Sequence, residues 1–377
     1  MQKLPISLLK PGMKVARTVY NTDGQVLLAA GMMLNVKFIS RLRMLGIISV
    51  YVEDSLMGGV EVYDVIAEDT RLQARKAIKR LHSEASRAVR SGNEPVIDDE
   101  QVSETINNII EDLLSSDDLI VNLSDIRVAD DYTFAHSVNT CVLALLTGVS
   151  LGFSKSRLHT LGLGTILHDI GKIKVPSEIL NKPGNFSQEE YKEIQKHPLY
   201  GFEMLRKNQS ISLTAAHVAY EHHERYNGEG YPRGLKGNHI HIFARIAGMV
   251  DVFDALVSDR VYRKGYLPHD AIEMITGSGN YYFDYDIVKA FIKNVAAYPV
   301  GTIVELSTGE LAIVIRTPRG CSHRPDVRTF VLKDGIPKIT GEISLSSETR
   351  ILIKRVISEE EYQSAQGMEL AANTAGI

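Results

Sequence analysis

Histidine is concentrated in one part of this chain. Ten of its 12 histidines lie between His136 and His269, where an even spread would place about four. Imidazole is the commonest protein ligand for metal ions and a good acid or base near neutral pH, so this enrichment points to a chemical site. The segment Leu167–Lys172 contains the best anchor for such a site, the neighbouring pair His168 and Asp169 followed by Lys172. A single His-Asp pair carries little weight, because chance alone gives nearly one in a chain of this composition.

The other residues in the region strengthen the metal interpretation. Downstream and upstream of the pair stand motifs built on His136, His197, His222, His223 and Asp251. Five histidines and two aspartates suit two divalent first-row metal ions, and a carboxylate can bridge both because it has two oxygens. Two ions about 3.5–4 Å apart lower the pKa of a bridging water and neutralise charge at a phosphorus atom under attack. The pattern therefore indicates a two-metal site suited to an in-line displacement at phosphorus.

In their order along the chain, these motifs resemble the HD-GYP subgroup of the HD phosphohydrolase superfamily. The resemblance covers residues 129–298 and includes Gly230-Tyr231-Pro232, the loop that gives the subgroup its name. Residues 1–55 also resemble a small domain often fused before HD-GYP domains. Members hydrolyse cyclic di-GMP, and some act on 3′,3′-cyclic GMP-AMP. The resemblance thus implies a cyclic di-GMP phosphodiesterase that forms linear pGpG through a metal-bridged hydroxide, with onward hydrolysis to GMP left open.

Site roles follow from the resemblance position by position. One ion is expected on His136, His168, Asp169 and Asp251, with Asp169 bridging to a second ion on His197, His222 and His223. Asp169 and Lys172 are the expected catalytic residues, Lys172 at a phosphate oxygen; the alternative for Lys172 is pairing with a nearby carboxylate. Substrate contacts are expected from Lys172, Tyr231, Arg260 and Arg263. A simple turn is the alternative for Tyr231, and helix-end cations are the alternative for the two arginines.

One position departs from the family pattern. Some members carry a glutamate four residues before the first histidine, where it supports a third metal, but here that residue is Tyr132. A phenol is mostly neutral at pH 7 and a poor ligand for hard or borderline cations. We therefore predict two divalent ions per chain, with Fe or Mn favoured and Zn, Co or Ni left open.

Sequence patterns around the site predict a multidomain chain with a mainly α-helical HD-GYP core. Residues 1–65 read as a small α/β domain, 66–128 as a helical linker with solvated charged faces, 129–298 as the metal phosphohydrolase domain, and 299–377 as a small β appendage and tail. The helices are predicted from apolar periodicity, and the strands from short β-branched runs between turn residues.

Composition excludes several classes of protein. The 377 residues are 44% hydrophobic and 23% charged with a net charge of −4, which is typical of a folded globular chain and gives no basic field for a nucleic-acid polymer. No apolar stretch long enough to span a membrane was found, and two cysteines suggest a reducing compartment, so a cytoplasmic protein is expected. A homodimer or a signalling protein partner is left open. The alternative functions are a catalytically silent cyclic-dinucleotide sensor or scaffold, and the same chemistry on 3′,3′-cyclic GMP-AMP.

Overall fold

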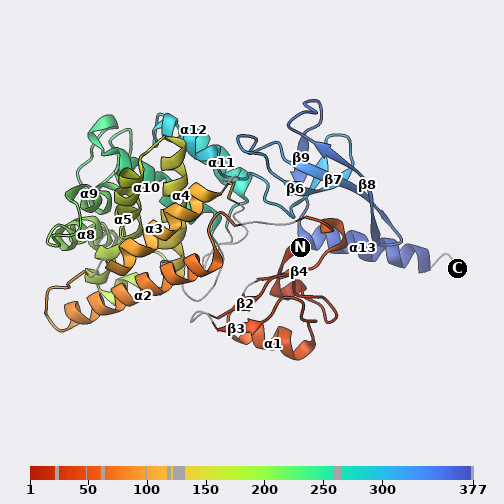
Figure 1. Cartoon of the computed structure of the whole chain (residues 1–377), viewed down its shortest axis with the longest axis horizontal. Coiled ribbons are helices and arrows are strands. Elements are labelled where there is room, and N and C mark those ends of the chain that lie inside the picture. Colours follow the sequence, from red (N-terminus) through yellow and green to blue (C-terminus); the bar gives the residue numbers. More distant parts are fainter. Residues whose placement is uncertain are drawn as a thin grey trace. The chain divides into compact units, whose positions relative to one another are not determined.

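The computed structural model describes residues 1–21, 25–47, 49–60, 64–97, 100–116, 120–121, 132–258 and 265–374. The chain forms two compact units (Figure 1). One is helical and consists of Val65–Leu119 and Tyr132–Asn294. The other combines Met1–Asp64, Ile120–Asp131 and Val295–Ile377.

The helical unit carries all the expected metal ligands. Its longer helices are α2 (Glu68–Arg90), α3 (Glu100–Ser115), α4 (Tyr132–Ser150), α5 (Lys155–Ile166), α8 (His197–Leu205), α9 (Leu213–Glu221), α10 (Ile242–Val257), α11 (Pro268–Gly277) and α12 (Tyr285–Ile292). Shorter helices are η4 (Ile170–Lys174), α6 (Ser177–Leu180), α7 (Gln188–Ile194) and η5 (Gly237–His239). Serine hydroxyls begin α5 and α9, where Ser154 and Ser212 accept hydrogen bonds from backbone N–H groups of the first turn.

Helices α4 and α10 form the centre of this unit because they are apolar on nearly every side. Val138, Leu143 and Leu145 of α4 and Met249 and Phe253 of α10 are completely buried. A helix that is apolar all round has to lie inside a protein or a membrane. No helix among the described residues is both long enough and apolar enough to cross a bilayer.

Two helices from the segment expected to be a linker, residues 66–128, take part in the helical core. Helices α2 and α3 belong to the same compact unit as the HD-GYP helices, with α2 packed on α3, α4 and η4. Their charges follow exposed faces as expected, but Ala74, Ile78 and Leu81 of α2 and Ile106 and Ile109 of α3 are buried. The apolar stripe of each helix therefore completes the helical core.

The second unit holds the N-terminal α/β segment and the C-terminal sheet. At the N-terminus β1 (Gln2–Pro5) pairs antiparallel with β4 (Ser49–Val52), and β2 (Val19–Tyr20) pairs with β3 (Val26–Leu28), beside α1 (Val36–Met44), η1 (Ile6–Leu8) and η2 (Ser55–Met57). The C-terminal sheet is antiparallel in the order β8-β7-β6-β5-β9, followed by α13 (Glu359–Thr374). Its strands are β5 (Ile303–Leu306), β6 (Leu311–Arg316), β7 (Asp326–Lys333), β8 (Ile336–Ser344) and β9 (Ile353–Val356).

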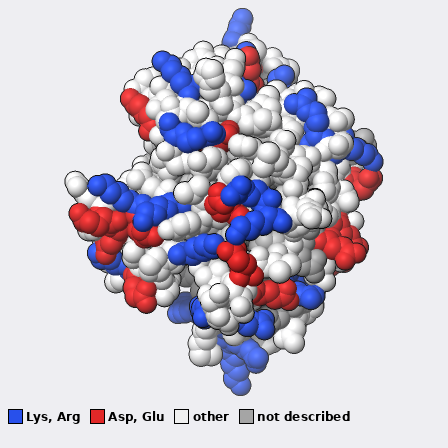
Figure 2. Space-filling view, turned by 90° about the vertical axis from the view of Figure 1, so that its left-hand side faces the viewer, with Lys and Arg blue, Asp and Glu red and all other residues white. Residues whose placement is uncertain are grey.

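The N-terminal and C-terminal parts share a hydrophobic cluster. Leu56 and Met57 of η2 pack with Ile313 and Phe330 of the sheet, and Arg328 Nη1 donates a hydrogen bond of 2.6 Å to the Leu56 carbonyl. The predicted fold class is confirmed, with a helical core, a small N-terminal α/β region and a small C-terminal β region. The face shown in Figure 2 carries basic and acidic side chains interspersed, as the balanced composition predicts.

Candidate metal centre

Seven of the sequence-predicted residues come together in the helical unit. His136 lies on α4, His168 and Asp169 stand between α5 and η4, and His197 is the first residue of α8. His222 and His223 directly follow α9, and Asp251 lies in α10. Their donor atoms form two groups, within 4.8 Å of one another in each: Asp169, His197, His222 and His223 in group one, and His136, His168 and Asp251 in group two.

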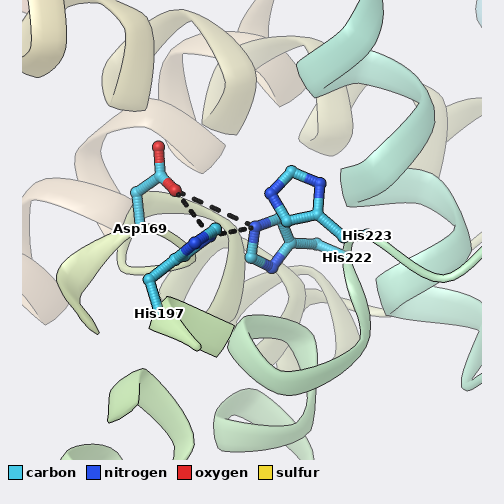
Figure 3. A group of neighbouring side chains, drawn as sticks. All are labelled: Asp169, His197, His222 and His223. Atoms are coloured by element: carbon cyan, nitrogen blue, oxygen red, sulfur yellow. Dashed lines mark hydrogen bonds and ion pairs between the residues drawn. The ribbon is translucent and has the colours of Figure 1, made fainter. Parts of the chain in front are cut away.

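Asp169 lies between the two groups. Its Oδ1 is 3.3 Å from His197 Nε2 and 3.9 Å from His222 Nε2, both in group one (Figure 3). Its Oδ2 is 3.3 Å from His168 Nε2 in group two. The two oxygens of one carboxylate therefore face different groups, which is the arrangement that a bridging ligand needs.

Three histidines are oriented by the same kind of hydrogen bond, from Nδ1 to the backbone carbonyl three residues earlier. The Nδ1 atoms of His168, His197 and His222 lie 2.7, 2.7 and 2.9 Å from the carbonyl oxygens of Thr165, Ile194 and Ala219. Only a protonated Nδ1 can donate to a carbonyl, so each Nε2 keeps its lone pair and points into the cluster. Nε2 of His168 is buried without a hydrogen-bond partner, and this orphaned acceptor fits a metal ion.

His136 is oriented by carboxylates instead. Its Nδ1 donates to Asp254 Oδ2 at 2.7 Å, and its Nε2 lies 3.1 Å from Asp251 Oδ1. Burial opposes protonation of His136, but the hydrogen bonds to Asp251 and Asp254 outweigh it and raise its pKa well above the usual value. Sequence reasoning missed Asp254, although its position one helical turn after Asp251 could have indicated it.

Burial and neighbouring charge set the protonation states of His222, His223 and Asp169. Burial lowers the pKa of His222 strongly and that of His223 to about 3, so both rings are neutral at neutral pH. Burial would raise the pKa of Asp169, but the positive charge of Lys172 beside it holds that pKa well below its usual range. Neutral imidazoles and ionised carboxylates are the forms that bind metal ions.

Lys172 and Tyr231, two of the expected substrate contacts, lie beside residues of this cluster. Lys172 Nζ is 2.6 Å from Asp169 Oδ2, and its side chain is 37% exposed. The ring of Tyr231 stacks on His223 with 4.7 Å between centroids and 28° between planes. Arg260 and Arg263 lie outside the described residues.

Two buried glutamates hold the loop that carries Tyr231. Glu224 accepts hydrogen bonds of 2.8 Å from the backbone N–H groups of Arg233 and Leu235. Glu221 accepts from the His241 backbone N–H at 2.8 Å and from the Arg233 guanidinium at 2.5 Å. These carboxylates give the loop a fixed position at the metal centre.

His82 of α2 is a second residue that sequence reasoning missed. Burial lowers its pKa to about 4, and its helix α2 packs on η4, the turn that follows Asp169. Its ring meets Phe134 edge-on at 5.4 Å. It lies 54 residues before His136, outside the histidine-rich region, so no motif spacing indicated it.

Two segments of this chain match known protein families. Residues 109–287 match the family described as HD domain, and residues 303–365 match the KOW domain associated with HD domain. A cyclic di-GMP phosphodiesterase of Pseudomonas aeruginosa is 36% identical over 234 residues, covering 62% of this chain and 56% of that protein. A 3′3′-cGAMP-specific phosphodiesterase of Vibrio cholerae is 30% identical over 193 residues, covering 51% of this chain and 37% of that one.

A solved structure supports the fold. An HDGYP protein of Bdellovibrio bacteriovorus superposes with a TM-score of 0.50 at 16% identity, covering 77% of this chain and 97% of that one. The chain spans about half or less of the length of the two curated relatives. Residues 109–287 therefore belong to the HD domain family, and this chain is similar in sequence to cyclic di-GMP phosphodiesterases and in fold to an HDGYP protein.

Proposed function

We propose that this protein is a two-metal phosphodiesterase that opens cyclic di-GMP to linear pGpG. The observation that carries the proposal is Asp169, whose two oxygens each lie 3.3 Å from a histidine of a different ligand group. A silent sensor would be expected to lack part of the ligand set, and all seven predicted ligands are present and grouped. Cyclic di-GMP is the favoured substrate because the cyclic di-GMP phosphodiesterase aligns with 62% of this chain, whereas the cGAMP-specific phosphodiesterase aligns with 51%.

The donor set suits borderline divalent cations. Five imidazoles and two carboxylates, without a thiolate, favour Fe or Mn, with Zn, Co or Ni as further candidates. Group two with Asp169 would hold one ion, and group one would hold the other. When bound, such a pair of ions activates a water molecule and neutralises charge on the phosphate.

This chain's own residues would orient the substrate. The ammonium group of Lys172 lies at the exposed edge of the cluster, where a phosphate oxygen could replace Asp169 as its partner. Tyr231, held against His223, would form one wall, and Arg260 and Arg263 are proposed to bind the nucleotide. The buried walls exclude water from the far side of the ligands, because His168, His197 and His222 are at most 1% exposed.

The test is turnover by the metal-loaded full chain with each dinucleotide. Protein purified without oxygen, or reloaded with Mn²⁺, is incubated with cyclic di-GMP or 3′,3′-cyclic GMP-AMP, and the products are separated by chromatography. We expect pGpG from cyclic di-GMP and none from the Asp169→Ala variant. Faster cleavage of cyclic GMP-AMP would show that this dinucleotide is the preferred substrate. Binding of either dinucleotide without cleavage would show that the protein is a sensor.

A further inference from the structure

A line of buried polar side chains runs from α2 to the metal centre. It consists of Arg71 on α2, Asn139 and His136 on α4, and Asp254 on α10. Their exposed fractions are 6%, 4%, 6% and 0%. Three helices thus contribute polar groups to one interior path that ends at an expected metal ligand.

The hydrogen bonds of this path have one consistent direction. Arg71 Nη1 donates to Asn139 Oδ1 at 3.4 Å, and Asn139 Nδ2 donates to Asp254 Oδ1 at 3.4 Å. The other oxygen of Asp254 accepts the 2.7 Å hydrogen bond from His136 Nδ1. An amide between a cation and a carboxylate can satisfy both only in this orientation, with oxygen towards the guanidinium and nitrogen towards the carboxylate.

Each member of the path depends on the next because all of them are removed from water. A buried charge is tolerated only when it is paired and hydrogen-bonded, and a half-satisfied polar network is unfavourable. Without Arg71, the amide oxygen of Asn139 loses this donor and the amide is no longer held towards Asp254. Asp254 would then be a looser anchor for the His136 ring, and carboxylates behind ligating histidines set ring orientation and basicity.

We propose that Arg71 is a positioning residue of the metal centre, acting through Asn139 and Asp254 on His136. The proposal rests on the proposed function, since it requires that His136 bind a metal ion. Arg71 lies in the first two turns of α2, before the matched HD domain begins at residue 109.

The experiment measures metal binding rather than activity. Metal-stripped full-length protein is titrated with Mn²⁺ by calorimetry, and circular dichroism checks the fold of each variant. Arg71→Met removes the guanidinium, and Asn139→Ser removes the bridge with a polar residue too short to span both partners. We expect each to weaken one of two Mn²⁺ binding steps by about tenfold and leave the other step unchanged, because only His136's ion depends on the path.

Three further variants make the result specific. Arg71→Lys keeps the charge and should retain part of the affinity lost in Arg71→Met. The double variant Arg71→Met with Asn139→Ser should bind Mn²⁺ no more weakly than the single variant with the lower affinity, because both residues act through one path. Arg80→Met is the matched control on the same helix, since Arg80 pairs at the surface with Glu84, and it should bind Mn²⁺ like the wild type.

The outcomes separate this inference from the proposed function. Wild-type protein that takes up no Mn²⁺ would refute the metal centre itself. Wild-type binding in two steps, with both steps unchanged in folded Arg71→Met or Asn139→Ser protein, would overturn the role of Arg71 and leave the centre standing. Losses that multiply in the double variant would show that the two residues act separately and would also overturn it.

Discussion

Gly171 offers a geometric test of the site, because it lies where η4 meets α8. A Cβ atom on Gly171 would stand 3.0 Å from Gly201 Cα, and closer still to the His197 carbonyl oxygen and the Gly201 nitrogen. Carbon atoms pack at about 3.5–4.0 Å, so alanine at this position has to push the two backbones about 1 Å apart. All the close neighbours are backbone atoms, so no side-chain rotation relieves the clash.

The displacement falls on two expected ligands. Asp169 lies two residues before Gly171, and His197 begins α8; Asp169 Oδ1 and His197 Nε2 are now 3.3 Å apart. A misplacement of about 1 Å in a catalytic constellation can cost about 100-fold in rate, so we expect Gly171→Ala to lower kcat/KM for cyclic di-GMP by about that factor. Overpacking should also cost about 1–3 kcal/mol of stability.

Chromatographic rates and Mn²⁺ content are measured for Gly171→Ala and for a matched control. The control is Gly277→Ala, since Gly277 is an exposed helical glycine whose added Cβ would meet nothing within 4 Å. It should keep wild-type activity and metal. If folded Gly171→Ala protein turned over cyclic di-GMP within about threefold of the wild type, the close approach of η4 and α8 would not set the geometry of the centre.

Three more changes test separate parts of the site. Lys172→Met should lower kcat by at least about tenfold while both metals remain, because in the proposed mechanism Lys172 would stabilise charge on the phosphate and would bind no metal. Loss of metal would show that Lys172 mainly supports Asp169. Replacing Arg260 and Arg263 together with alanine should raise KM at unchanged metal content, and lower metal content would assign them elsewhere. The pKa of His82 is about 4 in the folded protein, against 6.5 for an ordinary histidine. As the pH falls from about 6.5 towards 4, His82 is therefore protonated in the unfolded chain before it is protonated in the folded protein, and the free energy of unfolding decreases. In metal-free protein, His82→Gln should remove up to about 2 kcal/mol of the loss between pH 7 and pH 5 in urea unfolding; an unchanged pH dependence would contradict burial of a neutral His82.

The candidate metal ligands could be selected from the sequence because residue types and their spacing indicate metal-binding chemistry. His168 and Asp169 are adjacent, His222 and His223 are adjacent, and ligands of this kind have few substitutes in a metal site. The division into two groups with Asp169 between them could be expected from the resemblance to the HD-GYP family. The distances and orientations that make Asp169 face both groups depend on how five segments pack, and no local pattern specifies that.

The residues that sequence reasoning missed are recognisable only in three dimensions. Asp254 acts from one turn beyond Asp251, and an aspartate on an apolar helix could equally have been a second ligand. Arg71 and His82 lie on α2, whose many charges read as a solvated face until packing showed which side is buried. Long-range contacts between α2 and α4 join residues about 70 positions apart, beyond the reach of helical periodicity.

The central claim is that two metal ions lie on either side of Asp169. Anomalous diffraction from crystals of the Mn²⁺-loaded protein tests it most directly, with elemental analysis to give the number of ions per chain. We expect two well-occupied peaks about 3.5–4 Å apart, one at each oxygen of Asp169, with one beside group one and the other beside group two. A single peak, or a third beside Tyr132, would contradict the two-metal centre.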